Sequence, residues 1–205
     1  MNKCLDAVVQ KASWKKAVLF TILFAVFYIL INYSGTGVAG LLRVTGGASI
    51  LDFEFGYTQG KAFDMLTALG AEGRVFYLTK ILPVDFPFPF AYMLFYSGWI
   101  ALLIKEALLN KRFPEEAVRV GWHKYLLLIP VLAMLSDWME NVGIITMLRG
   151  YPHLPEWAVM LASDAGMIKT VFTIASIAVI VLLLIAFLIN KYAEAGRLKN
   201  RRGQR

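Results

Sequence analysis

The chain has few cysteines, histidines and charged residues, and these shortages exclude several classes of protein. Its single cysteine, Cys4, excludes an internal disulfide framework and a zinc site built from several cysteines. Charged residues make up only 17% of the 205 residues, whereas soluble domains carry about 25%. The apolar fraction is 59%. So much apolar surface with so little charge excludes a soluble enzyme and a disordered tail.

The apolar residues are concentrated in four runs of membrane-spanning length. These runs cover about residues 17–33, 86–104, 125–148 and 171–190, close to the ~20 residues that a helix needs to cross a bilayer. The sequence therefore predicts an all-α polytopic membrane protein, a four-helix transmembrane bundle with a polar interior, made of one domain (residues 1–205). A basic stretch before a short apolar run is also typical of a cleavable signal. The length of the first run favours an uncleaved anchor.

Acidic residues are in the minority, and the basic excess is unevenly placed. The chain has 21 Lys and Arg against 14 Asp and Glu, a net charge of +7. The excess lies before the first span, between the second and third spans, and in the tail at residues 191–205. Because basic flanks mark the cytoplasmic side, we expect a multi-pass protein of the cell (plasma) membrane with both termini in the cytoplasm. We expect membrane lipids as partners, with anionic headgroups at the cytoplasmic face, and no nucleic acid. The connection between the second and third spans contains Lys105, Lys111, Arg112, Arg119 and Lys124.

The outer loop at residues 34–85 is the only long connection. Its glycine-rich start predicts turns, and the alternation of apolar and acidic residues over 51–57 predicts an extended strip. Thr58 is placed to cap a short helix that ends near Gly70. A second helix over residues 71–82 is expected to stop at Pro83. Both helices are amphipathic, so we expect them to lie on the outer membrane surface.

Polar residues inside the predicted spans are rare and therefore informative. On a helical wheel, Asp137, Glu140 and Asn141 share one face of the third span, with Asp137 near its middle. A charged residue at the bilayer centre costs about 2.5–3.5 kcal/mol on insertion scales, so two carboxylates there need compensation. We expect Lys169, at the outer end of the fourth span, to extend toward Glu140 along apolar surface.

The second and fourth spans also carry polar residues along one face. Asp85, Tyr92 and Tyr96 fall on one face of the second span, and the fourth span is polar only in its outer half, where Lys169 lies. Lipid cannot satisfy such groups. The stripes are therefore expected to face one another inside the bundle, mostly toward its outer side.

Several of these positions also have a purely structural interpretation. Asp85 is placed to be the N-cap of the second span, and Ser163 or Asp164 is expected to cap the fourth. Lys169 is also compatible with an interfacial anchor. Arg74 is a candidate contact for phosphate at the outer headgroup level, although a solvated helix face explains it as well.

Paired carboxylates on one face are the main indication of chemistry. Such pairs serve as acid and base or hold a hard divalent cation; the sequence identifies no metal site and leaves the cofactor unknown. We expect a membrane-embedded enzyme that uses these carboxylates on a lipid-like or isoprenoid substrate near the outer leaflet. Two alternatives stay open: a binding or transport module for a cation, a proton or a small amphiphile, and a non-catalytic assembly subunit. The candidate catalytic residues are Asp137, Glu140, Asn141 and Lys169, and the candidate substrate contacts are Asp85, Tyr92, Tyr96 and Arg74.

Short motifs in this order resemble a group of proteins. Residues 69–77 follow the pattern Leu-Gly-x-x-Gly-Arg-x-x-Tyr, residues 85–87 are Asp-Phe-Pro, residues 137–141 follow Asp-x-x-Glu-Asn, and a lysine opens the last span. Over about residues 50–190 the chain resembles an uncharacterised group of small four-span prokaryotic integral membrane proteins. The resemblance implies the four-span layout and no particular reaction, substrate or cofactor.

Overall fold

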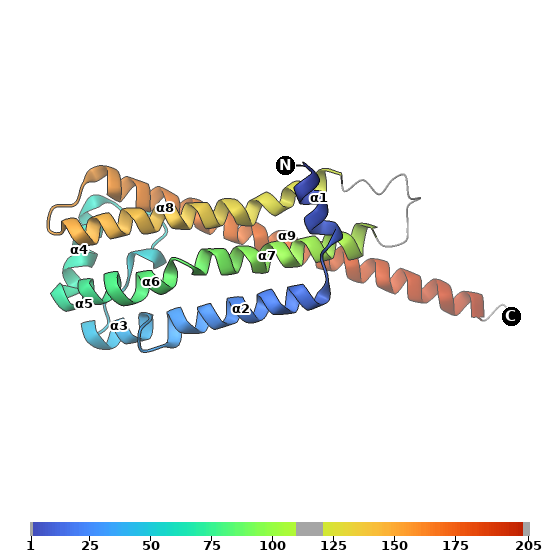
Figure 1. The fold of residues 1–205 in the computed structure, drawn as a ribbon, viewed down its shortest axis with the longest axis horizontal. Helices are drawn as coiled ribbons and strands as arrows, with labels where there is room; N and C mark the ends of the chain where they lie inside the picture. Colours follow the sequence, from blue (N-terminus) through green and yellow to red (C-terminus); the bar gives the residue numbers. More distant parts are fainter. Residues whose placement is uncertain (1, 110–120, 203–205) are drawn as a thin grey trace.

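The computed structural model describes residues 2–109 and 121–202 of the chain (Figure 1). Within these residues the regular structure is entirely helical. Four helical stretches are long and apolar enough to cross a membrane. The predicted all-α four-helix bundle is therefore confirmed. Lys111, Arg112 and Arg119 of the predicted cytoplasmic connection, and Arg205 of the tail, lie outside the described residues. The four stretches are Trp14–Thr45, Gly70–Ala107, Trp122–Gly150 and Glu156–Ala193.

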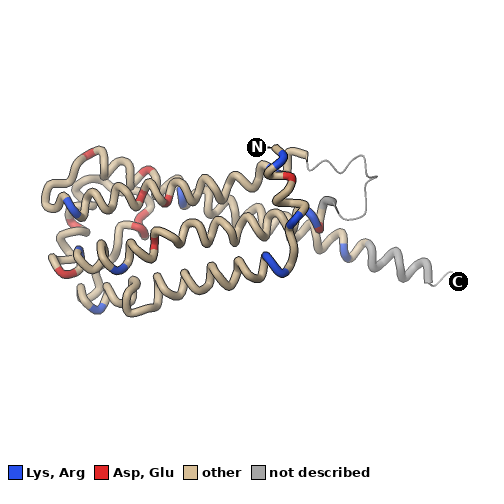
Figure 2. Tube along the Cα trace, viewed as in Figure 1, with Lys and Arg blue, Asp and Glu red and all other residues tan. Residues whose placement is uncertain are grey.

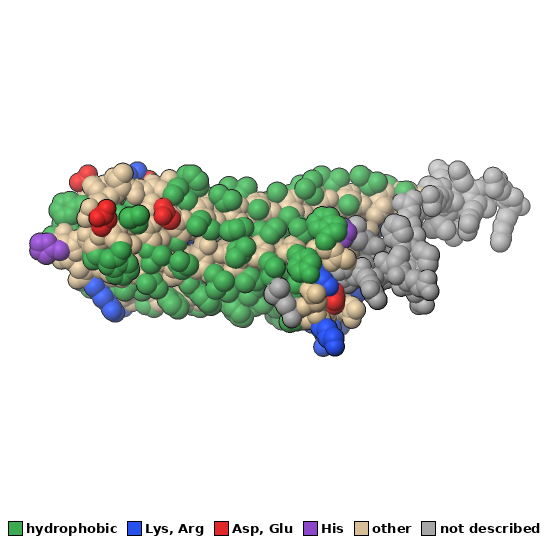
Figure 3. Space-filling view, turned by 90° about the horizontal axis from the view of Figure 1, so that it is seen from above, with side chains coloured by type: hydrophobic (Ala, Val, Ile, Leu, Met, Phe, Trp, Pro, Cys, Tyr) green, Lys and Arg blue, Asp and Glu red, His purple; other side chains and the backbone are tan. Residues whose placement is uncertain are grey.

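Four long helices form the shaft of the molecule (Figure 1). They are α2 (Trp14–Tyr33), α7 (Phe88–Ile104), α8 (Leu128–Gly150) and α9 (Glu156–Arg202). α8 and α9 pack most extensively against each other, and α7 packs against both. α2 packs mainly against α7 and lies at the edge of the bundle. Figure 3 shows hydrophobic side chains covering the shaft between its two ends, as expected of a surface that contacts lipid.

The first three spans lie close to their predicted positions, but the fourth begins earlier. α9 starts at Glu156, directly after Pro155, instead of near residue 171. Ser163 and Asp164 lie inside this helix, so the prediction that one of them caps it is wrong. A proline followed by an acidic residue is itself a helix-start signal, and here it outweighs the Ser-Asp pair. The Ser163 hydroxyl oxygen instead accepts the backbone N–H of Tyr57 at 2.9 Å.

A nearly continuous helical path leads into the second span. It consists of α5 (Gly70–Phe76), a π turn (Tyr77–Ile81) and α6 (Leu82–Asp85). The helix does not stop at Pro83, so that prediction is wrong. Pro83 directly follows the π turn, where the Leu82 N–H bonds to the Tyr77 carbonyl oxygen five residues earlier. The regular i→i−4 bonding is already interrupted at this point, so a residue without an N–H costs less here than inside a regular α-helix. The path breaks only at the turn that precedes α7.

The long connection between the first and second spans folds over one end of the shaft. We call this part the crown: α3 (Val38–Thr45), a 3₁₀ turn (Leu51–Phe53), α4 (Gln59–Ala68) and α5. The predicted cap of α4 is confirmed, because the Thr58 hydroxyl oxygen accepts the backbone N–H of Lys61. One buried cluster joins the crown to α8 and α9, and it includes Leu41, Leu51, Leu66, Tyr77, Ile144, Met147, Ala158 and Ala162.

The predicted extended strip over residues 51–57 is wrong. The chain makes the 3₁₀ turn at Leu51–Phe53 instead. Leu51 is buried in the crown cluster, whereas Phe53 and Phe55 are exposed. An isolated strand leaves its backbone groups without partners, and the turn satisfies some of them locally through the bond from the Glu54 N–H to the Leu51 carbonyl oxygen.

The opposite end of the shaft carries the N-terminal helix and is filled by apolar side chains. α1 (Asn2–Gln10) lies across this end (Figure 1). A second buried cluster here includes Val9, Ile100, Ile104, Leu127 and Leu183. Figure 2 shows that the shaft between this end and the crown half has a stretch with few charged residues. The molecule therefore has a polar interior in its crown half and an apolar one in its other half.

Candidate functional site

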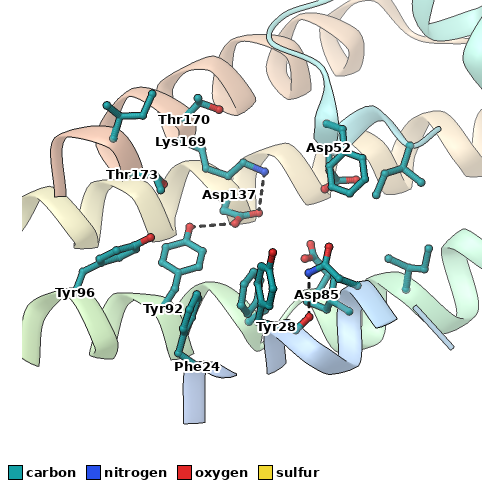
Figure 4. Close-up of a pocket in the computed structure, with 17 residues that line it drawn as sticks. Phe24, Tyr28, Asp52, Asp85, Tyr92, Tyr96, Asp137, Lys169, Thr170 and Thr173 are labelled. Atoms are coloured by element: carbon teal, nitrogen blue, oxygen red, sulfur yellow. Dashed lines mark hydrogen bonds and ion pairs between the residues drawn. The ribbon is translucent and has the colours of Figure 1, made fainter. Parts of the chain in front are cut away.

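A cavity of about 410 Å³ lies in the crown half of the shaft (Figure 4). α2, the 3₁₀ turn of the crown, the segment from Ile81 to Tyr96, α8 and α9 all contribute to its wall. Five of the predicted site residues line it: Asp85, Tyr92, Tyr96, Asp137 and Lys169. Much of the remaining wall is aromatic or aliphatic, including Phe24, Tyr28, Ile31, Phe53, Phe88 and Ile174.

Lys169 is paired with both acidic residues of α8. Its Nζ lies 2.5 Å from Glu140 Oε2 and 3.8 Å from Asp137 Oδ1. The two carboxylates share one face of α8 because residues three positions apart are neighbours on a helix. The predicted contact between Lys169 and Glu140 is therefore present. Figure 4 shows the Lys169 ammonium directed toward Asp137, so this residue is not a simple interfacial anchor.

A glycine of α9 makes room for Glu140. Gly166 lies about one turn before Lys169, and a Cβ atom at Gly166 would come within 2.6 Å of Glu140 Oε1. The fully buried carboxylate of Glu140 thus lies directly against the α9 helix. Among the described residues, Glu140 Oε1 and Asn141 Oδ1 have no hydrogen-bond partner. These buried oxygens leave acceptor capacity in the polar interior.

Asp137 and Asp85 each accept a hydrogen bond from a neutral donor. The Tyr92 hydroxyl donates to Asp137 Oδ2 at 3.0 Å, and the Asn141 amide donates to Asp85 Oδ2 at 2.7 Å. Asp85 is the last residue of α6, and α7 has Pro87 at its N-cap position without any side-chain cap. The interpretation of Asp85 as an N-cap is therefore wrong. Its carboxylate belongs to the site network instead.

Asp52 is a further acidic residue of the cavity that the sequence analysis did not select. It lies on the 3₁₀ turn of the crown, lines the cavity and accepts a hydrogen bond from the hydroxyl of the fully buried Tyr77. The expected strip placed Asp52 on the side opposite to its apolar neighbours. The only signal in the sequence was Tyr77 itself, because a buried tyrosine hydroxyl usually has a polar partner, and this does not identify Asp52 as that partner.

Tyr57 adds a second tyrosine from the crown. Its hydroxyl is buried and has no hydrogen-bond partner among the described residues. Burial raises the pKa of the Tyr57 hydroxyl above its usual range, and the negative charge of Glu140 raises it further. Tyr57 is therefore a neutral hydroxyl that keeps its proton at physiological pH.

Arg74 is not brought to the cavity. Its guanidinium donates to the Leu66 carbonyl oxygen at 2.8 Å and lies 3.8 Å from the centre of the Tyr151 ring. These contacts connect α5 with α4 and with the turn between α8 and α9. In this position Arg74 supports the crown and does not face the bundle interior.

The carboxylates are not arranged as a metal site. In the described part of the chain, no group of three or more His, Cys, Asp or Glu residues is placed to hold a metal ion. The Lys169 ammonium is paired with both Asp137 and Glu140, where a cation bridging them would have to bind. The geometry favours proton transfer or head-group binding by the carboxylates over a hard divalent cation.

The cavity opens toward the side of the bundle. α2 and α9 face each other across it, and neither packs extensively on the other. Tyr28 of α2 and Ile174 of α9 line the cavity and remain 43% and 61% exposed. In the other direction the cavity ends at Tyr96, beyond which apolar residues fill the bundle. The exposed Tyr28 and Ile174 side chains therefore place an opening on the side of the shaft, and the α1 half of the bundle closes the cavity in the other direction.

The structure thus brings most of the predicted residues together beside this opening, in two bonded groups: Tyr92–Asp137–Lys169–Glu140 and Asn141–Asp85. Comparison with protein-family models, curated proteins and solved structures finds no match to the chain. A fold alone does not imply an activity, so the chemistry of the site is what indicates the function.

Proposed function

We propose that the protein is a membrane-embedded enzyme that acts on a lipid-like or isoprenoid amphiphile. One observation carries this proposal: the Asp137–Lys169 pair lies on the wall of a cavity that opens between α2 and α9. An amphiphile in the bilayer enters such an opening sideways. Its tail then lies against the aromatic and aliphatic wall, and its polar head comes to rest beside the two charged groups.

Asp137 is the residue that we assign as general acid or base. It lines the cavity, and the bond from Tyr92 fixes the orientation of its carboxylate. A catalytic acid or base has to lie within hydrogen-bond distance of the proton that it transfers, and a head group in this cavity meets that requirement. Lys169 also lines the cavity and supplies a positive charge for an oxygen of the substrate.

Glu140 and Asn141 act through their neighbours. Neither lines the cavity, but Glu140 pairs with Lys169 and Asn141 donates to Asp85. We therefore assign them as positioning residues, which hold the charged groups of the wall in place. Asp52 and Asp85 are the proposed head-group contacts on the crown side, and Tyr92 and Tyr96 are the aromatic contacts on α7.

A transport path through the bundle has less support. Such a path needs polar groups along its whole length, whereas the half of the bundle next to α1 is filled by apolar side chains. Ile180 lies near Tyr96, where the polar wall ends. A substrate site that is reached from the membrane fits this distribution better.

We further propose that the site faces the outer leaflet of the cell membrane and that both termini are cytoplasmic. The support is the distribution of charge, because Lys3, Lys11, Lys15 and Lys16 all lie at the α1 end of the shaft. Positive residues beside spans stay on the cytoplasmic side, which supports a crown on the outer side.

The enzyme proposal is tested by lipid conversion. The purified wild-type protein is reconstituted with a total bacterial lipid extract, and all lipid masses are compared before and after incubation. We expect one lipid class to decrease and a product to appear with the wild type. The product should be absent with Asp137→Asn, which leaves the Lys169–Glu140 pair intact, and present with the control Asp164→Asn on the exposed face of α9. Equal conversion by Asp137→Asn contradicts the proposal.

A further inference from the structure

A second groove lies at the end of the molecule opposite to the crown. Its volume is about 390 Å³, and α1, α2 and α7 form its walls. The floor is apolar, with Phe20 from α2 and Leu94 and Ala101 from α7. This groove shares no lining residue with the cavity of the candidate site.

The groove has a fixed shape because α1 is held against the shaft. The Lys105 ammonium donates to the carbonyl oxygens of Gln10 and Ala12, at 3.0 and 2.8 Å, just where α1 ends. Val9 of α1 and Ala12 are buried against the shaft. The wall formed by α1 is therefore anchored by polar contacts at its end and by apolar packing along its length.

The rim of the groove carries uncompensated positive charge. Lys11 and Lys16 line the groove and are exposed. The Lys16 ammonium donates to the Lys11 carbonyl oxygen at 3.0 Å, and no carboxylate in the described residues forms an ion pair with either lysine. Asp6, the acidic residue of α1, is paired with Lys124 instead, at 3.0 Å. An anion at the rim would thus meet two available ammonium groups.

We propose that this groove binds one anionic phospholipid, with the phosphate between Lys11 and Lys16 and an acyl chain along Phe20, Leu94 and Ala101. The lysines lie where α2 begins, which is the headgroup level of a span that starts at Trp14. A short helix across the end of a bundle, with apolar residues inward and lysines outward, is typical of a membrane interface. The groove therefore matches both halves of the lipid, and this site does not depend on the proposed enzyme activity.

The test is the retention of lipid by the full chain in native mass spectrometry. The protein is released from nanodiscs that contain equal amounts of palmitoyl-oleoyl phosphatidylglycerol and phosphatidylcholine. We expect the wild type to retain the anionic lipid preferentially. In Lys11→Gln/Lys16→Gln this preference should fall about 30-fold, at about 1 kcal/mol for each lysine near the surface and tenfold for every 1.4 kcal/mol. The control Arg43→Gln/Lys80→Gln removes the same charge from α3 and the π turn, at the opposite end of the shaft, and should retain the preference.

A second variant and a labelling experiment separate the groove from the surface. Ala7→Trp fills the groove and leaves both lysines in place, so it should also lose the anionic lipid. Cys4, the only cysteine, lines the groove, and its reaction with a maleimide should be slower in nanodiscs with the anionic lipid than in phosphatidylcholine alone. Full retention by Ala7→Trp, or a labelling rate that is the same in both lipids, overturns the proposal and leaves only adsorption to the basic surface. Equal retention by the wild type and the lysine variant overturns it as well.

Discussion

Lys169 of α9 and Glu140 of α8 form an ion pair whose Nζ and Oε2 atoms are 2.5 Å apart, and the Glu140 side chain has no exposed surface. The pair joins the two helices that pack most extensively against each other. In a bilayer neither charge can be hydrated by bulk water, so each depends on the other. The pair therefore holds the polar wall of the cavity together as well as the two helices.

Removing one member of this pair should destabilise the bundle. Lys169→Met leaves the buried Glu140 without a counterion, and we expect the free energy of unfolding to fall by about 3–5 kcal/mol. Equilibrium unfolding in detergent micelles, followed by circular dichroism, measures this change. The double variant Lys169→Met/Glu140→Met removes both charges and should recover most of the loss. A double variant as unstable as Lys169→Met would show that the pair is not what stabilises the wall.

Filling the space next to Glu140 should also destabilise the bundle. Gly166→Ala places a methyl group 2.6 Å from Glu140 Oε1, and we expect a loss of about 1–3 kcal/mol from the forced shift of the carboxylate or of α9. Gly60→Ala is the matched control, because nothing lies within 4 Å of its Cβ position. The control should be neutral or stabilising by up to about 1 kcal/mol. If the two variants unfold alike, the close approach of Glu140 to α9 is not real.

The bond between Tyr77 and Asp52 should hold the crown turn in place beside the cavity. Tyr77→Phe removes the donor and keeps the ring, and a hydrogen bond to a charged group contributes about 1.5–3 kcal/mol. We expect faster amide hydrogen exchange over residues 50–57 in this variant. Tyr192→Phe, at a position that is 76% exposed, should leave the exchange of this segment unchanged. Wild-type exchange rates in Tyr77→Phe would mean that the turn is held by the packing of Leu51 alone.

If the substrate enters between α2 and α9, a larger side chain at the opening should slow lipid conversion, and the same side chain elsewhere on α9 should not. Ile174 lines the cavity and Ile177, also exposed on α9, does not. Ile174→Trp should obstruct the opening and lower the rate of lipid conversion about a hundredfold, the cost of displacing a substrate by about 1 Å. Ile177→Trp adds the same bulk outside the opening and should keep the wild-type rate. Equal rates in the two variants would place the entrance elsewhere.

The sequence was informative wherever the signal was local. Hydropathy and the helical period are properties of neighbouring residues, so the spans and the shared face of Asp137 and Glu140 could be predicted. The length of the Lys169 side chain was enough to anticipate its contact with Glu140. The polar half of the bundle interior followed in the same way, because the Lys169 stripe on α9 ends at Ile180.

The crown side of the site could not be predicted, because it depends on contacts between distant residues. Asp52 meets Tyr77, and Tyr57 meets Ser163, and no periodicity within either segment indicates these pairings. The contact between Tyr57 and Ser163 also explains why the start of α9 was predicted wrongly. The Ser163 hydroxyl accepts a bond from the crown and does not cap a helix. Local patterns thus located the wall formed by the spans, and tertiary packing supplied the wall formed by the loop.

The most direct test of the account is native mass spectrometry of the protein released from nanodiscs that contain a bacterial lipid extract. The account predicts a retained amphiphile that is lost in Asp137→Asn/Glu140→Gln and kept in Lys11→Gln/Lys16→Gln, because the cavity and the basic groove are separate. The lipid of the basic groove should be retained by the wild type and the carboxylate variant alike. If the wild type retains no species beyond that lipid, or if the carboxylate variant keeps every further species, a substrate site in the bundle interior is contradicted.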